Sequence, residues 1–201
     1  MSFATYADLK TSVATWLHRT DLTAMIPDFI ALAEARLSAD LDTRAMESRS
    51  TLTATSGDAW LTLPTDLLEV RRLTVATDPV RVLEYAAPDQ IAHDFNSGVT
   101  GIPNAYAVIG TQIQLAPTPD AAYDFELSYW QRIPALSDSN TSNWLLVASP
   151  ACYLYGALCE AAPYMQDDER IAVWEGKYKQ AVDDVNAIDW YSGSTMRVRA
   201  G

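Results

Sequence analysis

The spacing of apolar residues changes twice along this chain, and these changes constrain its fold more than any other feature. In residues 1–43 apolar side chains recur every three or four positions, as on one face of an α-helix. In residues 44–135 they alternate with polar ones, as in half-buried strands, and in residues 136–191 the helical spacing returns. We therefore expect an α+β fold: a four-helix bundle formed by the N- and C-terminal helix pairs, with an inserted antiparallel β module.

Two amphipathic helices are expected in residues 1–43. The stripe of the first consists of Tyr6, Leu9, Val13, Trp16 and Leu17. Pro27 suits the first turn of the second, where its missing N–H costs nothing. Arg36 and Asp40 lie one turn apart on that helix, and we expect both to face water.

Turn residues divide the middle section into short strands. The expected elements are a strand at 51–55 that turns at Ser56–Asp58 into a return strand at 59–63, a strand around Leu68–Val75 with a bulge at Arg71–Arg72, a return at 80–85, a short helix at 88–95, a hairpin around Gly110–Thr111, and a strand at 123–133. We expect this section to be a run of antiparallel strands.

The C-terminal section begins with a polar loop at 136–143. Ser149–Pro150 opens a helix that is apolar nearly all round, which is typical of a central helix or a subunit contact. The acidic run 167–169 suits the start of the last helix. The tail, 192–201, contains Arg197 and Arg199 but no acid, and we expect it to be loose unless a partner orders it.

The charge balance excludes several classes of function. The 201 residues include 26 acids and 14 bases, a net charge of −12, which argues against a sequence-reading nucleic-acid binder and against docking on anionic lipid. The N-terminus shows no basic segment followed by an apolar run, and the least charged stretch, 144–165, is broken by proline and glycine. We expect neither a secretory signal nor a membrane span, and synthesis in cytoplasm.

No pattern of reactive residues indicates catalysis. His18 and His93 have no partner at metal-ligand spacing, and Cys152 and Cys159 are expected to be buried, reduced thiols. The acidic pairs that could serve a hydrolase lie in 167–169 and 183–184, where a helix start and a solvated helix face explain them. We therefore predict no enzyme, and no catalytic, cofactor-binding or metal-binding residue.

The aromatic residues point to contacts between surfaces. Trp16 and Trp174 belong to the core stripes of the first and last helices. Four others lie at element ends or in loops, where aromatic residues are enriched at protein interfaces: Trp130, Trp144, Trp190 and Tyr191. They fit equally well a seam between the bundle and the β module or a contact with another protein.

Three stretches together resemble a known family. They are Thr5–Leu17 with Ile26–Leu37; Leu63–Glu69 with Gly101–Pro103 and Leu115–Pro117; and Tyr129–Asp138 with Thr141–Leu146, Leu154–Leu158 and Asp167–Arg170. In content and order they are similar to bacteriophage head-to-tail adaptor (connector) proteins, related to the tubular tail protein A of short-tailed phages. The likeness covers nearly the whole chain.

The resemblance implies a structural virion protein at the head–tail junction. Such adaptors form a ring, usually of twelve copies, beneath the portal protein; they extend the channel through which double-stranded DNA passes, and the tail or nozzle protein docks on them. The resemblance also makes residues 190–201 the candidate contact with the portal protein, where Arg197 and Arg199 would meet acidic groups of the portal. The alternatives are another neck or tail-completion protein, or a tail-associated cell-wall hydrolase that uses Asp167 or Asp168.

Overall fold

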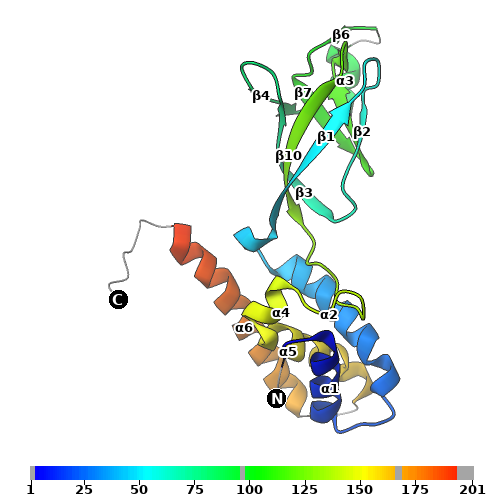
Figure 1. Cartoon of the computed structure of the whole chain (residues 1–201). Helices are drawn as coiled ribbons and strands as arrows, with labels where there is room; N and C mark the ends of the chain where they lie inside the picture. Colours follow the sequence, from blue (N-terminus) through cyan, green and yellow to red (C-terminus); the bar gives the residue numbers. More distant parts are fainter. Residues whose placement is uncertain (1–2, 96–97, 166–168, 194–201) are drawn as a thin grey trace. The chain divides into compact units, whose positions relative to one another are not determined.

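The computed structural model describes residues 3–95, 98–165 and 169–193, and it has the mixed α+β class predicted from the sequence (Figure 1). The chain divides into two compact units. Residues 1–46 and 133–201 form one, here called the helical unit, and residues 47–132 form the other, the β unit. Both ends of the chain therefore build one unit, and the second unit is inserted in it.

The helical unit is organised around one central helix. Its elements are α1 (Tyr6–Leu17), α2 (Ile26–Asp40), α4 (Trp144–Ala148), α5 (Pro150–Glu160) and α6 (Arg170–Gly193), with 3₁₀ turns at Thr23–Met25, Arg44–Met46 and Ala162–Tyr164. α1, α2, α4 and α6 all contact α5, whose Tyr153, Ala157 and Leu158 are completely buried. The nearly all-apolar surface of α5 is thus explained by its central place. No helix in the described part of the chain is long and apolar enough to span a membrane.

Local signals determine where these helices begin and end. The Thr5 hydroxyl accepts a hydrogen bond from the Asp8 N–H at 3.2 Å and the Asp8 carboxylate accepts one from the Thr5 N–H, which is a capping box. Pro27 lies in the first turn of α2, as predicted. α1 ends at Leu17, and the capping residue after it, His18, adopts a left-handed conformation with φ of 52°.

The β unit contains two four-stranded sheets and a small third sheet. Its elements are β1 (Glu47–Ala54), β2 (Trp60–Thr62), β3 (Leu67–Val75), β4 (Arg81–Val82), β5 (Glu84–Tyr85), α3 (Pro88–Asp94), β6 (Thr100–Gly101), β7 (Ala105–Ile109), β8 (Gln112–Ala116), β9 (Thr118–Pro119) and β10 (Tyr123–Gln131). The strand orders are β1-β10-β3-β4, β2-β8-β7-β5 and β6-β9. One core joins both large sheets, with Phe125 and Leu127 from the first and Ile113 and Leu115 from the second.

Two expectations about strand pairing are wrong. β1 and β2 do not form a hairpin ladder, because β1 pairs with β10 and β2 pairs with β8 in the other sheet. The unit is also not entirely antiparallel, since β5 pairs with β7 and β6 with β9 in parallel. The segment after β4 explains the first parallel pair. It leaves β3 at Leu83 and crosses to β7, where the Glu84 N–H donates to Asn104.

Other expected details are confirmed. The pairing of β10 with β3 shifts register where Ser128 faces Arg72 and Tyr129 faces Val70, which is the irregularity predicted at Arg71–Arg72. β7 and β8 form the hairpin around Gly110, whose φ is +61°. α3 packs on β7 through the small side chains of that strand.

Candidate protein interfaces

Trp130 lies near the end of β10 and is half-buried. The Arg71 guanidinium sits 4.9 Å from the centre of its ring, and Arg71 also approaches the Glu47 carboxylate at 3.9 Å. A cation of the same unit therefore covers part of the indole. The partly exposed ring and its arginine form an amphipathic patch on the outer face of the first sheet.

Trp144 is the first residue of α4 and is also half-buried. Its indole N–H is shielded from solvent and has no hydrogen-bond acceptor among the described residues. Such an unpaired donor costs free energy comparable to a lost hydrogen bond.

The remaining predicted interface residues lie at the end of the chain. Trp190 and Tyr191 belong to the last turn of α6, and their side chains lie outside the described part. Arg197 and Arg199, like Asp167 and Asp168, lie outside the described residues. α6 itself extends to Gly193, into the segment expected to be tail.

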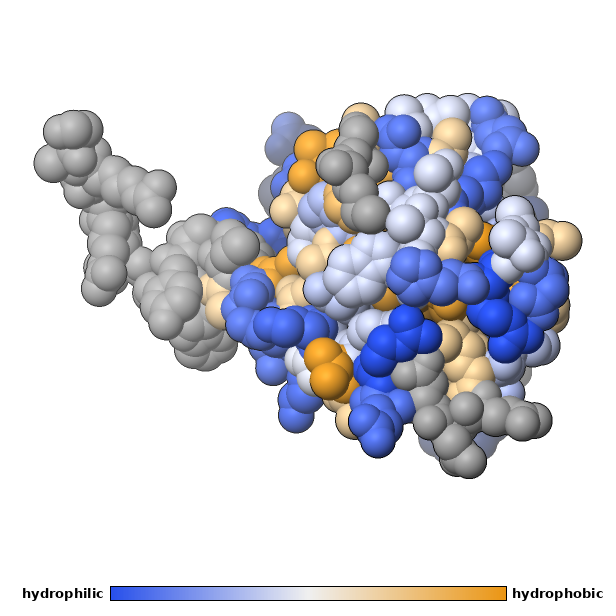
Figure 2. All heavy atoms as spheres, turned by 90° about the horizontal axis from the view of Figure 1, so that it is seen from below, coloured by the Kyte–Doolittle hydropathy of each residue, from blue (hydrophilic) through white to orange (hydrophobic). Residues whose placement is uncertain are grey.

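The two tryptophans assigned to core stripes differ in burial. Trp174 is buried, whereas Trp16 is half-buried and packs edge-on against Tyr155 with ring centres 5.8 Å apart. Figure 2 shows one face of the molecule on which hydrophilic side chains predominate and hydrophobic ones form small separate groups. Exposed large hydrophobic side chains occur in both units and include Leu32, Val147 and Val173 in the helical unit and Val80, Val82 and Tyr85 in the β unit.

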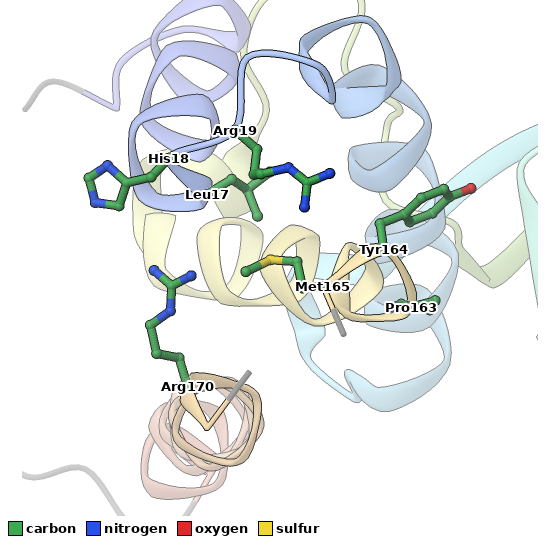
Figure 3. Close-up of a pocket in the computed structure, with 7 residues that line it drawn as sticks. All are labelled: Leu17, His18, Arg19, Pro163, Tyr164, Met165 and Arg170. Carbon is green, nitrogen blue, oxygen red and sulfur yellow. The ribbon is translucent and has the colours of Figure 1, made fainter. Parts of the chain in front are cut away.

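A pocket of about 770 Å³ opens where α1 ends and α6 begins (Figure 3). We call it the basic pocket; its described lining consists of Leu17, His18, Arg19, Pro163, Tyr164, Met165 and Arg170. Three of these seven residues carry or can carry positive charge, and none is acidic. Leu17 and Met165 supply apolar surface between the two arginines (Figure 3).

The cations of the basic pocket are oriented by neighbouring groups. Arg19 forms a two-point ion pair with Asp21, with nitrogen–oxygen distances of 2.8 and 2.6 Å, and this carboxylate raises the pKa of Arg19. Arg170 donates to the Trp16 carbonyl at 3.4 Å and lies 5.1 Å from the Trp174 ring centre. Both guanidinium groups are thus held at the pocket rather than swinging freely in solvent.

A second hollow, of about 310 Å³, lies between α2 and α6. We call it the α2–α6 groove; it is lined by Arg36, Asp40, Glu175, Tyr178, Lys179, Val182, Asp183 and Asn186. Arg36 is not the solvated residue expected from the sequence, because α6 partly covers it. It pairs with Glu175, approaches Asp40 and Glu160 at 3.6 Å each, and stacks 4.2 Å from the Tyr178 ring centre.

The charges in this groove are strongly coupled. The Arg36 guanidinium lowers the pKa of the Glu175 carboxyl, and the hydrogen bond to Glu175 raises the pKa of Arg36. The Tyr178 hydroxyl donates to Asp40 at 2.7 Å, and burial together with this carboxylate raises the pKa of Tyr178. Asp183, at the rim, is exposed and forms no ion pair with a described residue.

A buried polar network anchors the segment that precedes α4. Glu34 on α2 is only 8 % exposed, and its Oε1 accepts hydrogen bonds from the Leu136 N–H at 2.7 Å and the Tyr153 hydroxyl at 3.2 Å. The Asn143 amide donates to the Tyr153 oxygen at 2.6 Å and to the Pro134 carbonyl at 2.7 Å. Burial raises the pKa of Glu34, and the two donated hydrogen bonds partly offset that rise.

The residues considered for chemistry are not assembled into a reactive site in the described part of the chain. His93 is exposed and pairs with Asp94 at 2.8 Å. Cys152 and Cys159 are buried free thiols, as predicted, and burial raises the pKa of Cys159 to about 12. Among the described residues no group of three or more His, Cys, Asp or Glu could hold a metal ion.

Comparison with known proteins identifies the family. The family model described as SU10 adaptor protein matches residues 4–199, nearly the whole chain. A search of curated proteins found no match. The family consists of structural adaptor proteins and not of enzymes, so the hydrolase alternative based on Asp167 or Asp168 is not retained. The match covers both the helical unit and the β unit, and the chain belongs to the SU10 adaptor protein family.

Proposed function

We propose that this protein is the head-to-tail adaptor of a bacteriophage. Copies of it form a ring beneath the portal protein, extend the DNA channel, and present a platform on which the tail or nozzle protein docks. The observation that carries this proposal is the family match over residues 4–199. A closer relation to the tubular tail protein A of short-tailed phages, assembly at the head–tail junction of the virion and synthesis in the host cytoplasm belong to the same proposal.

A ring of twelve copies fits a passive role toward DNA. Each copy has a net charge of −12, so the assembled ring repels the phosphate backbone of the duplex. Double-stranded DNA then passes through the channel without specific binding. The repulsion is screened beyond about 8 Å in physiological salt, so it acts only on surfaces close to the duplex.

The division of the chain suggests a division of roles. In this proposal the four long helices of segments 1–43 and 136–191 act as one bundle-like block, and the module 44–135 supplies further contacts. The α5 helix, which the other helices surround, stabilises this block from within. Residues 190–201 are the proposed portal contact, in which Arg197 and Arg199 meet acidic groups of the portal protein.

Four aromatic side chains are proposed as interface anchors: Trp130, Trp144, Trp190 and Tyr191. The half-buried state of Trp130 and Trp144 supports this role, because such rings add contact area on docking.

Assembly with the portal protein of the same phage tests the proposal. Mass measurement and electron microscopy of the full chain, with and without the portal protein, should show rings, or monomers that become ordered rings on the portal. A protein that stays monomeric in the presence of the portal contradicts the proposal. Binding to the tail protein alone would instead identify another neck or tail-completion protein.

Removal of residues 192–201 tests the tail separately. The truncated chain should fold like the full chain, because the described core does not use these residues. Its affinity for the portal protein should fall. Unchanged affinity would remove the assignment of Arg197 and Arg199 while leaving the adaptor role intact.

A further inference from the structure

The helical unit has two hollows of different charge on opposite sides of α6. In an α-helix successive residues are about 100° apart, so the buried pair Trp174 and Tyr178 defines the inward direction of α6. Arg170, in the basic pocket, lies roughly 60° to one side of that direction. Glu175, in the α2–α6 groove, lies roughly 80° to the other side.

The charges of the two hollows are complementary. The described lining of the basic pocket has Arg19, Arg170 and His18 and no acid, and Asp21, which is not part of that lining, pairs with Arg19. The lining of the α2–α6 groove has three carboxylates against two basic groups, and Glu160 adds a fourth carboxylate beside Arg36. The Asp183 carboxylate of this groove is exposed and forms no ion pair with a described residue.

A second copy of this chain is therefore the occupant that the charges favour. At a net charge of −12, two copies repel unless surfaces of opposite sign meet, and a single copy provides both such surfaces. Surfaces that differ and lie on opposite sides of one helix give a head-to-tail contact, which forms a ring when its rotation closes. A twofold contact that packs either hollow on its own copy would instead place like charges together.

We propose that the basic pocket of one copy receives the Asp183 rim of the α2–α6 groove of a second copy, so that neighbours in the ring meet head to tail across α6. This rests on the adaptor ring proposed above and assigns the surfaces that build it. Because Asp183 is thirteen residues beyond Arg170, the two contact points are offset by about 20 Å along α6. In a closed ring α6 must therefore be inclined to the ring axis.

Charge reversal tests this contact in the full-length protein. Arg19→Glu and Asp183→Lys should each weaken assembly on the portal protein at least about tenfold, because each places like charges in contact. The double variant R19E/D183K reverses both surfaces and should recover assembly, as should an equimolar mixture of the two single variants. Assembly of the wild-type chain should weaken as salt is raised.

A neighbouring residue supplies the matched control. Asp184→Lys makes the same charge change one position further along α6, about 100° away from Asp183, and should leave assembly unchanged. Circular dichroism and thermal unfolding check that all variants fold, which is expected because Arg19 and Asp183 are exposed.

The outcomes separate this inference from the proposed function. If the wild-type chain forms rings on the portal but neither single reversal weakens them, the contact assigned here is wrong and the adaptor role stands. If both single variants fail and the double variant also fails, the pairing of these two surfaces is wrong. If the wild-type chain forms no ring, the proposed function fails, and the assigned contact fails with it.

Discussion

Replacing Glu34 should loosen the segment between β10 and α4 and lower the stability of the helical unit. In Glu34→Ala the Leu136 N–H and the Tyr153 hydroxyl both lose the acceptor that they reach at 2.7 and 3.2 Å. Each buried donor left unpaired costs about 1–3 kcal/mol. We therefore expect a loss of about 2–6 kcal/mol in the free energy of unfolding of this unit.

Two further variants separate the contributions of the network. Glu34→Gln keeps an acceptor oxygen for both donors and should cost only about 1 kcal/mol or less at neutral pH. Tyr153→Phe removes the hydroxyl that donates to Glu34 and accepts from the Asn143 amide but leaves the Leu136 hydrogen bond in place, and should cost about 1–3 kcal/mol. Because Glu34 and Tyr153 touch, their double-mutant cycle should give a coupling energy of at least about 0.5 kcal/mol.

The contribution of Glu34 to the free energy of unfolding changes with pH in a definite direction. Burial raises the pKa of Glu34 above its ordinary value of 4.5, so the folded state holds this proton more tightly than the unfolded chain. The contribution of Glu34 to stability is therefore greatest at low pH and decreases as pH rises from 4.5 through the raised pKa. Glu34→Gln cannot titrate, so wild-type stability minus variant stability should fall over this interval.

Amide hydrogen exchange gives the local readout. The Leu136 amide should exchange slowly in the wild type and in Glu34→Gln, and much faster in Glu34→Ala. Urea unfolding of the same proteins supplies the free energies. Equal protection of Leu136 in Glu34→Ala and wild type, or a difference curve that rises with pH, would refute the reasoning.

Three other predictions concern local packing and reactivity. Gly156→Val should lower the free energy of unfolding by about 1–3 kcal/mol, because even a Cβ there would lie 3.1 Å from the Cβ of Ala33 on α2. Gly176→Ala should raise it by up to about 1 kcal/mol, because the added Cβ would meet nothing within 4 Å. Melting temperatures of the two variants that shift in the same direction would contradict this. Thr5→Ala removes one half of the α1 capping box and should cost about 1 kcal/mol by urea unfolding, a result that an unchanged midpoint would overturn. Both cysteine thiols should resist iodoacetamide at pH 8 in the native protein and react in denaturant, as mass spectrometry can show; rapid native labelling would mean that the thiols are accessible.

The elements that sequence reasoning located well are those determined by near neighbours. Pro27 and Pro150 lie in the first turns of α2 and α5 because proline suits that position. Strict alternation in β10 correctly placed Phe125 and Leu127 in the core. The short helix α4 was missed, because five residues are too few to show a helical period.

The strand pairing could not be read from local signals. β1 looks like the first arm of a hairpin, yet its partner β10 lies about 70 residues further along the chain. The competition between a nearby strand and a distant one is decided by which faces reach the common core, and alternation alone does not determine this. The parallel pairs β5–β7 and β6–β9 were missed for the same reason.

The candidate interfaces show the same limit. Glu34 has the sequence setting of a solvated helical residue, and its burial depends on Leu136, which lies a hundred residues away. The basic pocket joins the end of α1 to the start of α6, so Arg170 lies about 150 residues from His18 and Arg19 in sequence. A cluster of bases at helix ends was the only available signal, and it does not indicate which ends meet.

The insertion of the β unit has a consequence for synthesis on the ribosome. About 110 residues separate the end of α2 from the start of α5. At a translation rate of 5–20 residues per second, α5, which completes the core of the first two helices, is synthesised roughly 5–20 s after them. During that interval the apolar stripes of α1 and α2 stay exposed on the nascent chain. The β unit ends at residue 132, so it is synthesised completely before α5. Slower translation across this stretch therefore lengthens the time for which those apolar side chains stay exposed on the nascent chain.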